Sequence, residues 1–392
     1  MKIKSWVAHR DLRKLSYGIL LKSGEDWKRN RLILNKELLA PEVVQKFVPH
    51  LNEVALDFVS MVNRNIEKSR RGHWAADISN DLFKFALESV HYILHGERLD
   101  LLQGYCNPAS QMFIDSVLKM FKSTVPILNI PVGLLKSINA KVWQEHIDSW
   151  DIIYKHANDS IQRAYRYMHQ RVKNDKAYLG ILAELLMQDI SLEDITVNIM
   201  ELNAGGIDTT SITLLWTMYS LAKYPNIQKN LRSEIMEANQ KTGGDPVQML
   251  QSVPLLKGAL KETLRLYPVA ITLQRYIVED IALQDYHIPA GTLVQTGLFA
   301  MGRSPEIFSN PEQYNPERWL KHGETSFRHL GFGFGPRQCI GRRLAETEIL
   351  LLLIQMLQNF NIETTNIAEV KPNFDLILLP EKPINLVFKA IN

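Results

Sequence analysis

One cysteine in this chain, Cys339, stands in a setting that could support metal chemistry. It lies in a glycine-rich stretch at residues 332–341 (FGFGPRQCIG), directly before a long apolar helical pattern. At a helix N-terminus the unpaired backbone N–H groups and the helix dipole favour negative charge on sulfur. We therefore expect Cys339 to be a thiolate ligand of a metal ion.

The residues beside Cys339 indicate which metal. A lone thiolate, with no second cysteine or histidine at ligand spacing, does not suit tetrahedral zinc or an iron–sulfur cluster, but it does suit haem iron. Arg337 stays protonated, and its planar guanidinium can donate two hydrogen bonds to the carboxylate of a haem propionate. Phe332 can screen the sulfur from water, and Gly335 and Gly341 let the backbone approach a flat group. The alternative is a small buried cysteine in a turn.

A second candidate site lies inside a long helical pattern. Residues 191–194 (SLED) form a helix-start signal, and the pattern continues for about 34 residues, or about 50 Å. Its middle, residues 204–210 (AGGIDTT), contains two glycines that cost about 1 kcal/mol each. These small residues could let another helix approach closely. Alternatively, the weakened turn leaves room for a small molecule above a haem, with Asp208 and Thr209 as the acid and hydroxyl of a proton relay.

The elements that must position these residues are mainly helical. Apolar residues recur every three or four positions in several stretches, each of which predicts a helix: 41–67, 82–94, 113–121, 142–168 and 254–267. The period changes to two at 272–278, 281–283 and 292–296, which predicts a small antiparallel sheet with a turn at 289–291. A helix follows Cys339 to residue 360, and strands are expected near 375–379 and 384–389. We expect one mainly α domain, residues 1–392, with small β-sheets.

Composition narrows the function classes. The 392 residues are 46% hydrophobic, enough for a large core, and a net charge of +3 is too small to indicate nucleic-acid binding. If Cys339 binds iron, Cys106 has no disulfide partner, which favours a reducing compartment. No uninterrupted run of about 18 apolar residues predicts a membrane span. The broken apolar segment 126–136 (PILNIPVGLLK) is interpreted as a buried loop, with a lip that dips into a membrane as the alternative.

The stretch around Cys339 resembles the proximal haem loop of the haem-thiolate monooxygenases, the cytochrome P-450 superfamily. Further motifs occur in that family's order: Trp-x-x-x-Arg at 27–31, AGGIDTT at 204–210, Glu-x-x-Arg at 262–265 and PERW at 316–319. Residues 77–83 (DISNDLF), 121–128 (FKSTVPIL) and 373–383 (NFDLILLPEKP) resemble its mitochondrial steroid branch. The resemblance implies the family's fold, a triangular and mainly helical domain with small sheets.

The resemblance also implies roles for individual residues. The residues that would hold a haem b group are Cys339 as axial thiolate, Arg337, Trp27, Arg31 and Phe332. Arg275, in the first predicted strand, needs an anion if it is buried, and a second propionate is the candidate. Judged without the family, Trp27 and Arg31 would be a surface cation–aromatic pair.

Catalytic, scaffold and substrate positions follow in the same way. Asp208 and Thr209 match the acid and the alcohol of the family's distal helix. Glu262, Arg265 and Arg318 match residues that interlock to fix the cysteine loop, although the first two alone would indicate only a minor surface pair. The positions that match sterol contacts are mostly apolar or small: Trp6, Phe121, Leu128, Gly205, Thr209, Thr272, Gln274, Phe374 and Leu376.

The implied activity is oxidation of a sterol with O2, by cleavage of the cholesterol side chain to pregnenolone. Electrons would come from a small acidic ferredoxin of the adrenodoxin type, docked on Lys257 and Lys261 with Arg342 and Arg343. The alternative for the two lysines is a solvated helix face. The implied location is the matrix side of the mitochondrial inner membrane, with peripheral membrane contact.

Two other functions stay open, an 11-beta-type steroid hydroxylase and a haem protein without activity. Family members are longer than this chain. We therefore expect it to lack the family's targeting peptide, first helix and first sheet strands.

Overall fold

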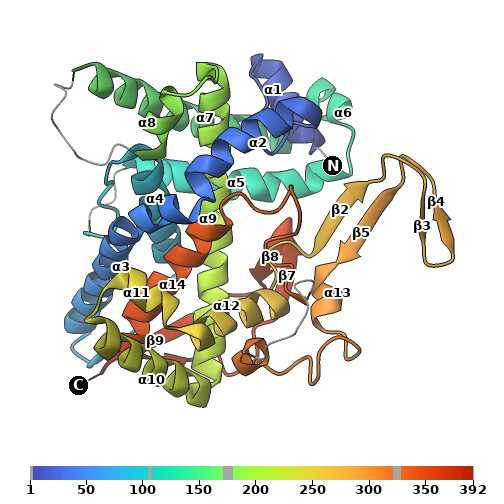
Figure 1. Ribbon diagram of the computed structural model, residues 1–392. Helices are drawn as coiled ribbons and strands as arrows, with labels where there is room; N and C mark the ends of the chain where they lie inside the picture. The colour runs from blue at the N-terminus through green and yellow to red at the C-terminus, as the bar shows by residue number, and fades with distance from the viewer. Residues whose placement is uncertain (1–2, 105–107, 171–179, 321–327, 392) are drawn as a thin grey trace.

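Helix α9 (Leu192–Lys223) runs through the middle of the molecule, and the other elements gather around it (Figure 1). The computed structural model describes residues 3–104, 108–170, 180–320 and 328–391. As the sequence predicts, Ser191 caps α9, because its side-chain oxygen accepts the N–H of Asp194 at 3.1 Å. Most residues of α9 are buried, so this helix forms the centre of the core.

The predicted long helices are all present. α3 (Pro41–Ser69) buries the apolar stripe seen in the sequence, including Phe47, Leu51 and Phe58. Four further predicted helices are α4 (Ser79–His95), α5 (Pro108–Leu128), α7 (Lys141–Gln170) and α12 (Pro254–Leu266). α14 (Arg342–Asn359) begins after Cys339 and packs against α3.

The remaining helices are shorter or more polar. They are α1 (Lys4–Arg13), α2 (Gly24–Leu38), α6 (Val132–Ser137), α8 (Gly180–Leu186), α10 (Pro225–Thr242), α11 (Pro246–Gln251), α13 (Leu298–Gly302) and the 3-10 helix η1 (Pro316–Trp319). α1 and α2 lie with α5 and α7 at one end of α9, while α10 and α12 lie at the other (Figure 1).

The sheet predicted between residues 272 and 296 is in fact two separate pairs. β2 (Thr272–Tyr276) pairs with β5 (Leu293–Gly297), and β3 (Ile281–Leu283) pairs with β4 (Tyr286–Ile288). The prediction joined them because β4 has only three residues and does not stand out as a strand. The β3–β4 hairpin projects from the body of the molecule (Figure 1).

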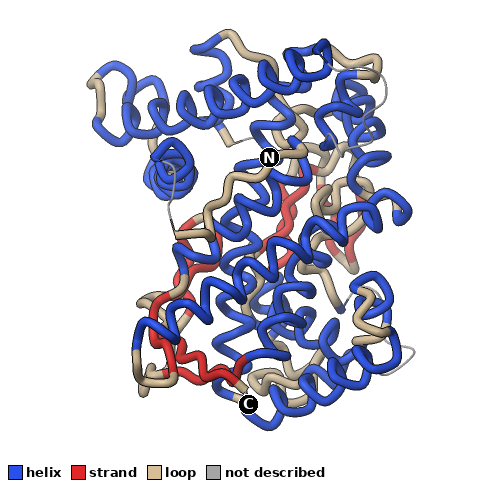
Figure 2. Tube along the Cα trace, turned by 90° about the vertical axis from the view of Figure 1, so that its left-hand side faces the viewer, coloured by secondary structure: helices blue, strands red, loops and turns tan. Residues whose placement is uncertain are grey.

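The remaining strands lie towards the C-terminus. β7 (Pro372–Asp375) pairs with β8 (Ile377–Pro380), and β9 (Asn385–Ala390) lies between β1 (His73–Asp77) and β6 (Phe360–Thr364). Figure 2 shows strands of this sheet beside the C-terminus. The sequence does not predict β1 or β6, because each is short and its register is set by the distant β9.

Segment 126–136 is not the buried loop that the sequence suggests. α5 continues through Pro126 and ends two residues later, and α6 follows. The side chains of Leu128, Ile130 and Leu134 are 43%, 37% and 53% exposed. Within the described ranges, no helix has the length and apolar character needed to cross a bilayer. Cys106 lies outside the described residues.

Candidate functional site

The loop before α14 is closed by a backbone hydrogen bond at Cys339. Its N–H donates to the carbonyl oxygen of Phe332 at 2.8 Å. Gly333 and Gly335 have φ of 75° and 74°, in the left-handed region that favours glycine. A Cβ at Gly335 would meet no atom within 4 Å. The loop therefore leaves open space close to the cysteine, as a flat ligand would require.

The position of Cys339 at the start of α14 does not by itself make its sulfur a thiolate. The side chain is exposed, yet protein surrounds the sulfur closely enough for burial to raise the pKa of the thiol. The Gly341 N–H, Arg31 and Arg342 act in the opposite direction and lower this pKa. A metal cation on the sulfur would stabilise the thiolate against the effect of burial.

Three guanidinium groups gather beside this loop, from Arg31 in α2, Arg275 in β2 and Arg337. Burial and the positive charges of Arg275 and Arg31 lower the pKa of Arg337. The Arg337 guanidinium carbon lies 3.9 Å from the centroid of the Trp27 ring, which holds it in place. Arg275 is exposed rather than buried, so solvent has access to this cluster.

Among the described residues, these three arginines make hydrogen bonds to neutral groups only. Arg31 donates to the Asn35 side-chain oxygen at 2.7 Å, and Arg337 donates to the carbonyl oxygen of Lys22 at 3.1 Å. Arg275 donates to the carbonyl oxygen of Gln274 at 2.8 Å. In the part of the chain that the structure describes, none of the three forms an ion pair with a carboxylate. Three cations without a counter-charge fit an anionic ligand, and the two propionates of a haem suit them.

The two glycines of the AGGIDTT turn in α9 face different surroundings. A Cβ at Gly206 would lie 2.7 Å from the Val90 side chain in α4, so this glycine permits close helix packing. A Cβ at Gly205 would meet nothing within 4 Å, so this glycine faces open space. The Thr209 hydroxyl donates to the Gly205 carbonyl at 2.7 Å, within the same turn. Gly206 therefore fits the interpretation of close helix packing, and Gly205 leaves the space that the second interpretation requires.

Asp208 is a buried carboxyl group with an unsatisfied oxygen. It is 2% exposed, and its Oδ1 atom has no hydrogen-bond partner among the described residues. Burial raises the pKa of Asp208 to about 8. At neutral pH the carboxyl is therefore mostly protonated and able to donate a proton. The neighbouring Thr209 is only half-buried.

A second buried cluster surrounds Glu262 in α12. Its two oxygens accept hydrogen bonds from Arg265 at 2.8 Å each, and one also accepts from Arg318 at 3.0 Å. The indole N–H of Trp319 donates to the same carboxylate at 2.9 Å, and the Asn315 backbone N–H donates at 2.8 Å. Glu262, Arg265 and Arg318 thus lie together, as the sequence analysis expects. Trp319 also belongs to this cluster, and the sequence analysis did not include it. The PERW motif contains this tryptophan, so the signal was present.

The candidate sterol residues fall on α1, α5, α9, β2 and the β7–β8 hairpin. Trp6 in α1 meets Phe121 in α5 edge-on at 6.2 Å between ring centroids, and its indole donates to Thr124 at 3.0 Å. α5 packs against β7, which carries Phe374, while Leu376 lies in the turn to β8. In β2, Gln274 donates to the Thr272 hydroxyl at 3.3 Å. Leu128 lies at the exposed end of α5.

The two candidate docking lysines are partly compensated by acids and rings. Lys257 and Lys261 are half-buried on α12. Burial lowers the pKa of Lys257, which Glu346 and Glu234 raise. The Lys261 ammonium lies 5.9 Å from the Trp319 ring centroid. In α14, Arg342 pairs with Glu346 at 3.1 Å.

Sequence reasoning also misses a strap, residues 16–22, that connects α9 to the cysteine loop. The backbone N–H groups of Ile19 and Leu20 donate to the side chains of Asn198 at 2.9 Å and Glu201 at 2.7 Å. The last strap residue, Lys22, offers its carbonyl to Arg337. The available signal is a polar stripe with helical spacing on an otherwise apolar helix.

The fold, the cysteine loop and the weakened turn of α9 together define a haem-thiolate enzyme. The chain belongs to the cytochrome P450 family, whose model matches residues 1–388. Members of this family carry haem with a cysteine thiolate ligand, which agrees with the open cysteine loop and the uncompensated arginines.

Comparison with individual relatives shows which members of the family this chain resembles. The chain is 62% identical over 392 residues to "Cholesterol side-chain cleavage enzyme, mitochondrial" of Hypanus americanus and 54% identical to the protein of that name in Oncorhynchus mykiss. It is 47% identical to "Cytochrome P450 11B, mitochondrial" of Aquarana catesbeiana. In each comparison all of this chain is covered, with 76%, 76% and 75% of the relative.

Proposed function

We propose that this chain is a sterol monooxygenase that cleaves the side chain of cholesterol to give pregnenolone, using O2 and electrons from a ferredoxin. The observation that carries the proposal is identity of 62% and 54%, over all 392 residues, with two proteins named for this reaction. Identity to the 11B-type relative is lower, at 47%. Cholesterol is therefore favoured over the smaller steroids of the 11-beta-type hydroxylase.

In this proposal Cys339 binds the iron of haem b, and Arg31, Arg275 and Arg337 bind its propionates. Their lack of carboxylate partners within the described ranges supports this role, since each guanidinium keeps a positive charge that no acid there compensates. Trp27 orients Arg337 through its ring, and Phe332 shields the sulfur. When bound, the haem supplies the activation of O2, which no side chain of the protein can perform.

Asp208 and Thr209 are proposed to deliver protons to the reacting oxygen. The protonated carboxyl of Asp208, whose Oδ1 atom has no partner among the described residues, is a proton source in a dry environment. The Thr209 hydroxyl donates a hydrogen bond to the Gly205 carbonyl, so its oxygen is free to accept a hydrogen bond from a neighbouring reactant or water. The open space at Gly205 provides room for such a molecule.

The sterol is proposed to lie against the apolar residues from α1, α5, β2 and the β7–β8 hairpin. Trp6 and Phe121 form one aromatic wall, and Phe374 and Leu376 approach from the hairpin. Thr272 and Gln274 add polar groups that a single sterol hydroxyl can use. Gly205 keeps the space above the haem free of a side chain, and Leu128 contributes at the exposed end of α5.

The proposed electron donor is an acidic mitochondrial ferredoxin that docks on Lys257 and Lys261. α12 packs against α14, and Lys261 and Arg342 both act on His329, which supports a shared positive face close to the cysteine loop. Replacing both lysines by Gln should weaken ferredoxin-supported turnover most strongly at low salt. Turnover that keeps its rate and its salt dependence in this double variant would exclude the docking role.

The chain is also proposed to act in mitochondria, on the matrix side of the inner membrane. The relatives above are named as mitochondrial proteins. Exposed Leu128, Ile130 and Leu134 give an apolar rim at the junction of α5 and α6 that suits peripheral contact with a bilayer.

The substrate is tested by spectral titration of the haem-loaded chain with cholesterol and with an 11-deoxysteroid. A tighter and larger spin shift with cholesterol, followed by pregnenolone formation with ferredoxin, its reductase and NADPH, is the expected result. A tighter shift with the 11-deoxysteroid would favour the 11-beta-type reaction instead. Cholesterol binding without product would favour a haem protein that has no activity.

A further inference from the structure

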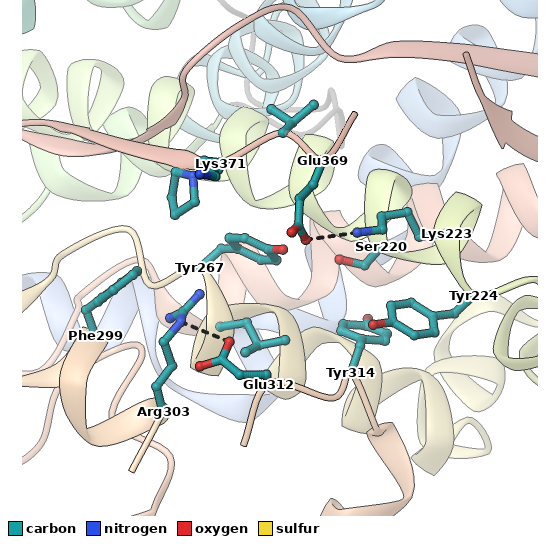
Figure 3. Close-up of a pocket in the computed structure, with 13 residues that line it drawn as sticks. Ser220, Lys223, Tyr224, Tyr267, Phe299, Arg303, Glu312, Tyr314, Glu369 and Lys371 are labelled. Carbon is teal, nitrogen blue, oxygen red and sulfur yellow. Dashed lines mark hydrogen bonds and ion pairs between the residues drawn. The ribbon is translucent and has the colours of Figure 1, made fainter. Parts of the chain in front are cut away.

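Charged groups near the two ends of α9 have different partners. At the C-terminal end, a cavity is lined by two ion pairs, Lys223 with Glu369 at 2.9 Å and Arg303 with Glu312 at 3.6 Å (Figure 3). Each charge in this wall is compensated by a neighbouring side chain. In the N-terminal third of the helix, by contrast, the carboxylate of Glu201 holds the backbone of the strap. The strap in turn contacts the cysteine loop.

Glu201 is enclosed between α9 and the strap. Its side chain is fully buried, and its Oε2 atom accepts the Leu20 N–H at 2.7 Å. Burial raises the pKa of Glu201 to about 7, while Arg10 and the N–H groups of Leu20 and Gly18 act in the opposite direction. A Cβ at Gly18 would lie 2.4 Å from the carboxyl group, so the strap passes directly over Glu201.

A turn of the strap connects this contact to Arg337. The Lys22 N–H donates to the Gly18 carbonyl oxygen at 2.9 Å, which closes the turn around Leu20. The Lys22 carbonyl oxygen then accepts a hydrogen bond from Nη2 of Arg337 at 3.1 Å. The orientation of the Lys22 carbonyl, and with it the acceptor offered to Arg337, therefore depends on where the turn is held.

Asn198, one turn before Glu201 on α9, holds the same strap. Its Oδ1 atom accepts the Ile19 N–H at 2.9 Å, and its amide donates to the side-chain oxygen of Asn30 at 2.9 Å. Asn30 directly precedes Arg31 in α2. One face of α9 is thus linked to two of the three arginines beside Cys339, to Arg337 through the strap and to Arg31 through α2.

The negative charge of Glu201 faces Arg10 of α1 without a hydrogen bond. Nη2 of Arg10 lies 3.8 Å from Oε1 of Glu201, and neither atom has a hydrogen-bond partner among the described residues. The Arg10 guanidinium lies instead over the Trp150 ring, 3.9 Å from its centroid. The charge of the carboxylate therefore serves Arg10, while its Oε2 atom serves the strap. Substitutions can separate these two effects.

We propose that Glu201 is a positioning residue for Arg337, whose guanidinium it holds, through the strap, where it can bind a haem propionate. This inference rests on the proposed haem site. Stacking on the Trp27 ring fixes the plane of the Arg337 guanidinium but not its rotation within that plane. The hydrogen bond to the Lys22 carbonyl supplies the missing restraint, because a hydrogen bond is directional.

The test compares Glu201→Gln with Glu201→Leu, both in an Arg10→Met background. Arg10 is replaced because Glu201→Leu alone would leave a buried charge without a partner. Gln keeps an acceptor for the Leu20 N–H, and Leu removes it. Haem transfer to a stronger acceptor protein should show a dissociation constant about 5-fold or more higher for the Leu variant, and within about 2-fold of the background for the Gln variant. Equal affinities of the two variants would refute the proposal.

Coupling to Arg337 separates a positioning role from a general loss of stability. When Arg337→Leu is added, the Gln and Leu variants of Glu201 should bind haem within about 2-fold of each other, because the strap no longer has a guanidinium to hold. A ratio that stays the same with and without Arg337 would refute the positioning role alone. A wild-type chain that takes up no haem would refute the proposed haem site together with this role.

Two further variants complete the test. Glu193→Leu is the matched control, because the exposed Glu193 accepts the N–H of Ser16, the first strap residue, at 2.7 Å. It should keep haem affinity within about 2-fold of wild type. Gly18→Ala forces the strap away from the intact Glu201 carboxyl and should weaken haem binding by about 5-fold, even if Glu201→Leu does not fold. Wild-type affinity in folded Gly18→Ala, or an equal loss in Glu193→Leu, would overturn the assignment.

Discussion

Two clusters of arginines in this molecule differ in where their counter-charge comes from. Around Glu262, the guanidiniums of Arg265 and Arg318 meet a carboxylate and several backbone carbonyls, all supplied by the chain. Beside Cys339, the guanidiniums of Arg31 and Arg337 have only neutral hydrogen-bond partners in the part of the chain that the structure describes. The same side chain is therefore expected to stabilise the fold in the first cluster and to bind a ligand in the second.

The largest effect on stability is expected when Glu262, the shared carboxylate of the first arginine cluster, is removed. Glu262→Ala leaves two buried guanidiniums and an indole N–H without their acceptor, so the free energy of unfolding should fall by about 3–5 kcal/mol. Urea denaturation of the ligand-free chain measures this. Glu317→Ala, which removes an exposed carboxylate in the same 3-10 helix, should change stability by no more than about 0.5 kcal/mol. Equal effects of the two substitutions would show that burial of Glu262 is not the cause.

Arg337→Leu should hardly change the stability of the ligand-free chain but should weaken haem binding. The ligand-free chain should lose no more than about 1 kcal/mol, because the lost cation–π contact with Trp27 is offset by relief of repulsion from Arg31 and Arg275. The dissociation constant for haem should rise by about 10-fold to 100-fold, as expected for a lost charged hydrogen bond. Haem transfer to a stronger acceptor protein measures it, with Arg337→Lys as the intermediate control. A loss of stability as large as that of Glu262→Ala would show that Arg337 stabilises the fold, in the same way as the arginines around Glu262.

Asp208 extends the comparison to an acid, since it lacks the partners that Glu262 has. Burial raises its pKa from 3.8 to about 8, so between these pH values the folded state holds a proton that the unfolded state has released. Stability should therefore fall as pH rises towards about 8 and level off above it. Asp208→Asn should remove this one-proton slope in urea denaturation, and turnover should fall by about 100-fold. The exposed carboxylate Asp285 provides the control variant, Asp285→Asn. An unchanged slope in Asp208→Asn would refute the protonated state.

The smallest effects are expected from the two glycines of α9. Gly206→Ala places a methyl group against Val90 and should destabilise the chain by about 1–3 kcal/mol. Gly205→Ala enters open space and should leave stability unchanged or raise it by up to about 1 kcal/mol. Thermal denaturation of the two variants side by side sharpens the distinction. Equal losses would mean that Gly205 also packs against a neighbour.

Local signals allow most of the helices and part of the site to be predicted. The apolar stripe of α3 and the Ser191 cap of α9 are patterns formed by residues that are close together in the sequence. Glu262 and Arg265 are also three residues apart, and Arg337 lies two residues before Cys339. The resemblance to a family added distant members such as Arg31, whereas Arg275 was a candidate because an arginine in a strand needs an anion if it is buried.

Contacts between distant segments could not be predicted, because no local pattern encodes them. The register of β1 on β9 is one case, and the strap that joins α9 to Arg337 is another. The separate environments of Gly205 and Gly206 depend on where α4 lies. Burial likewise raises the pKa of Cys339, although its place at a helix N-terminus suggests the reverse.

The most direct test of the account is the carbon monoxide difference spectrum of the reduced, haem-loaded chain and of its Cys339→Ser variant. The wild-type chain should give the Soret band of thiolate-ligated haem, and the variant should lose that band. A variant that keeps the wild-type band would show that Cys339 does not bind the iron. This result would contradict the proposed chemistry, which depends on that bond.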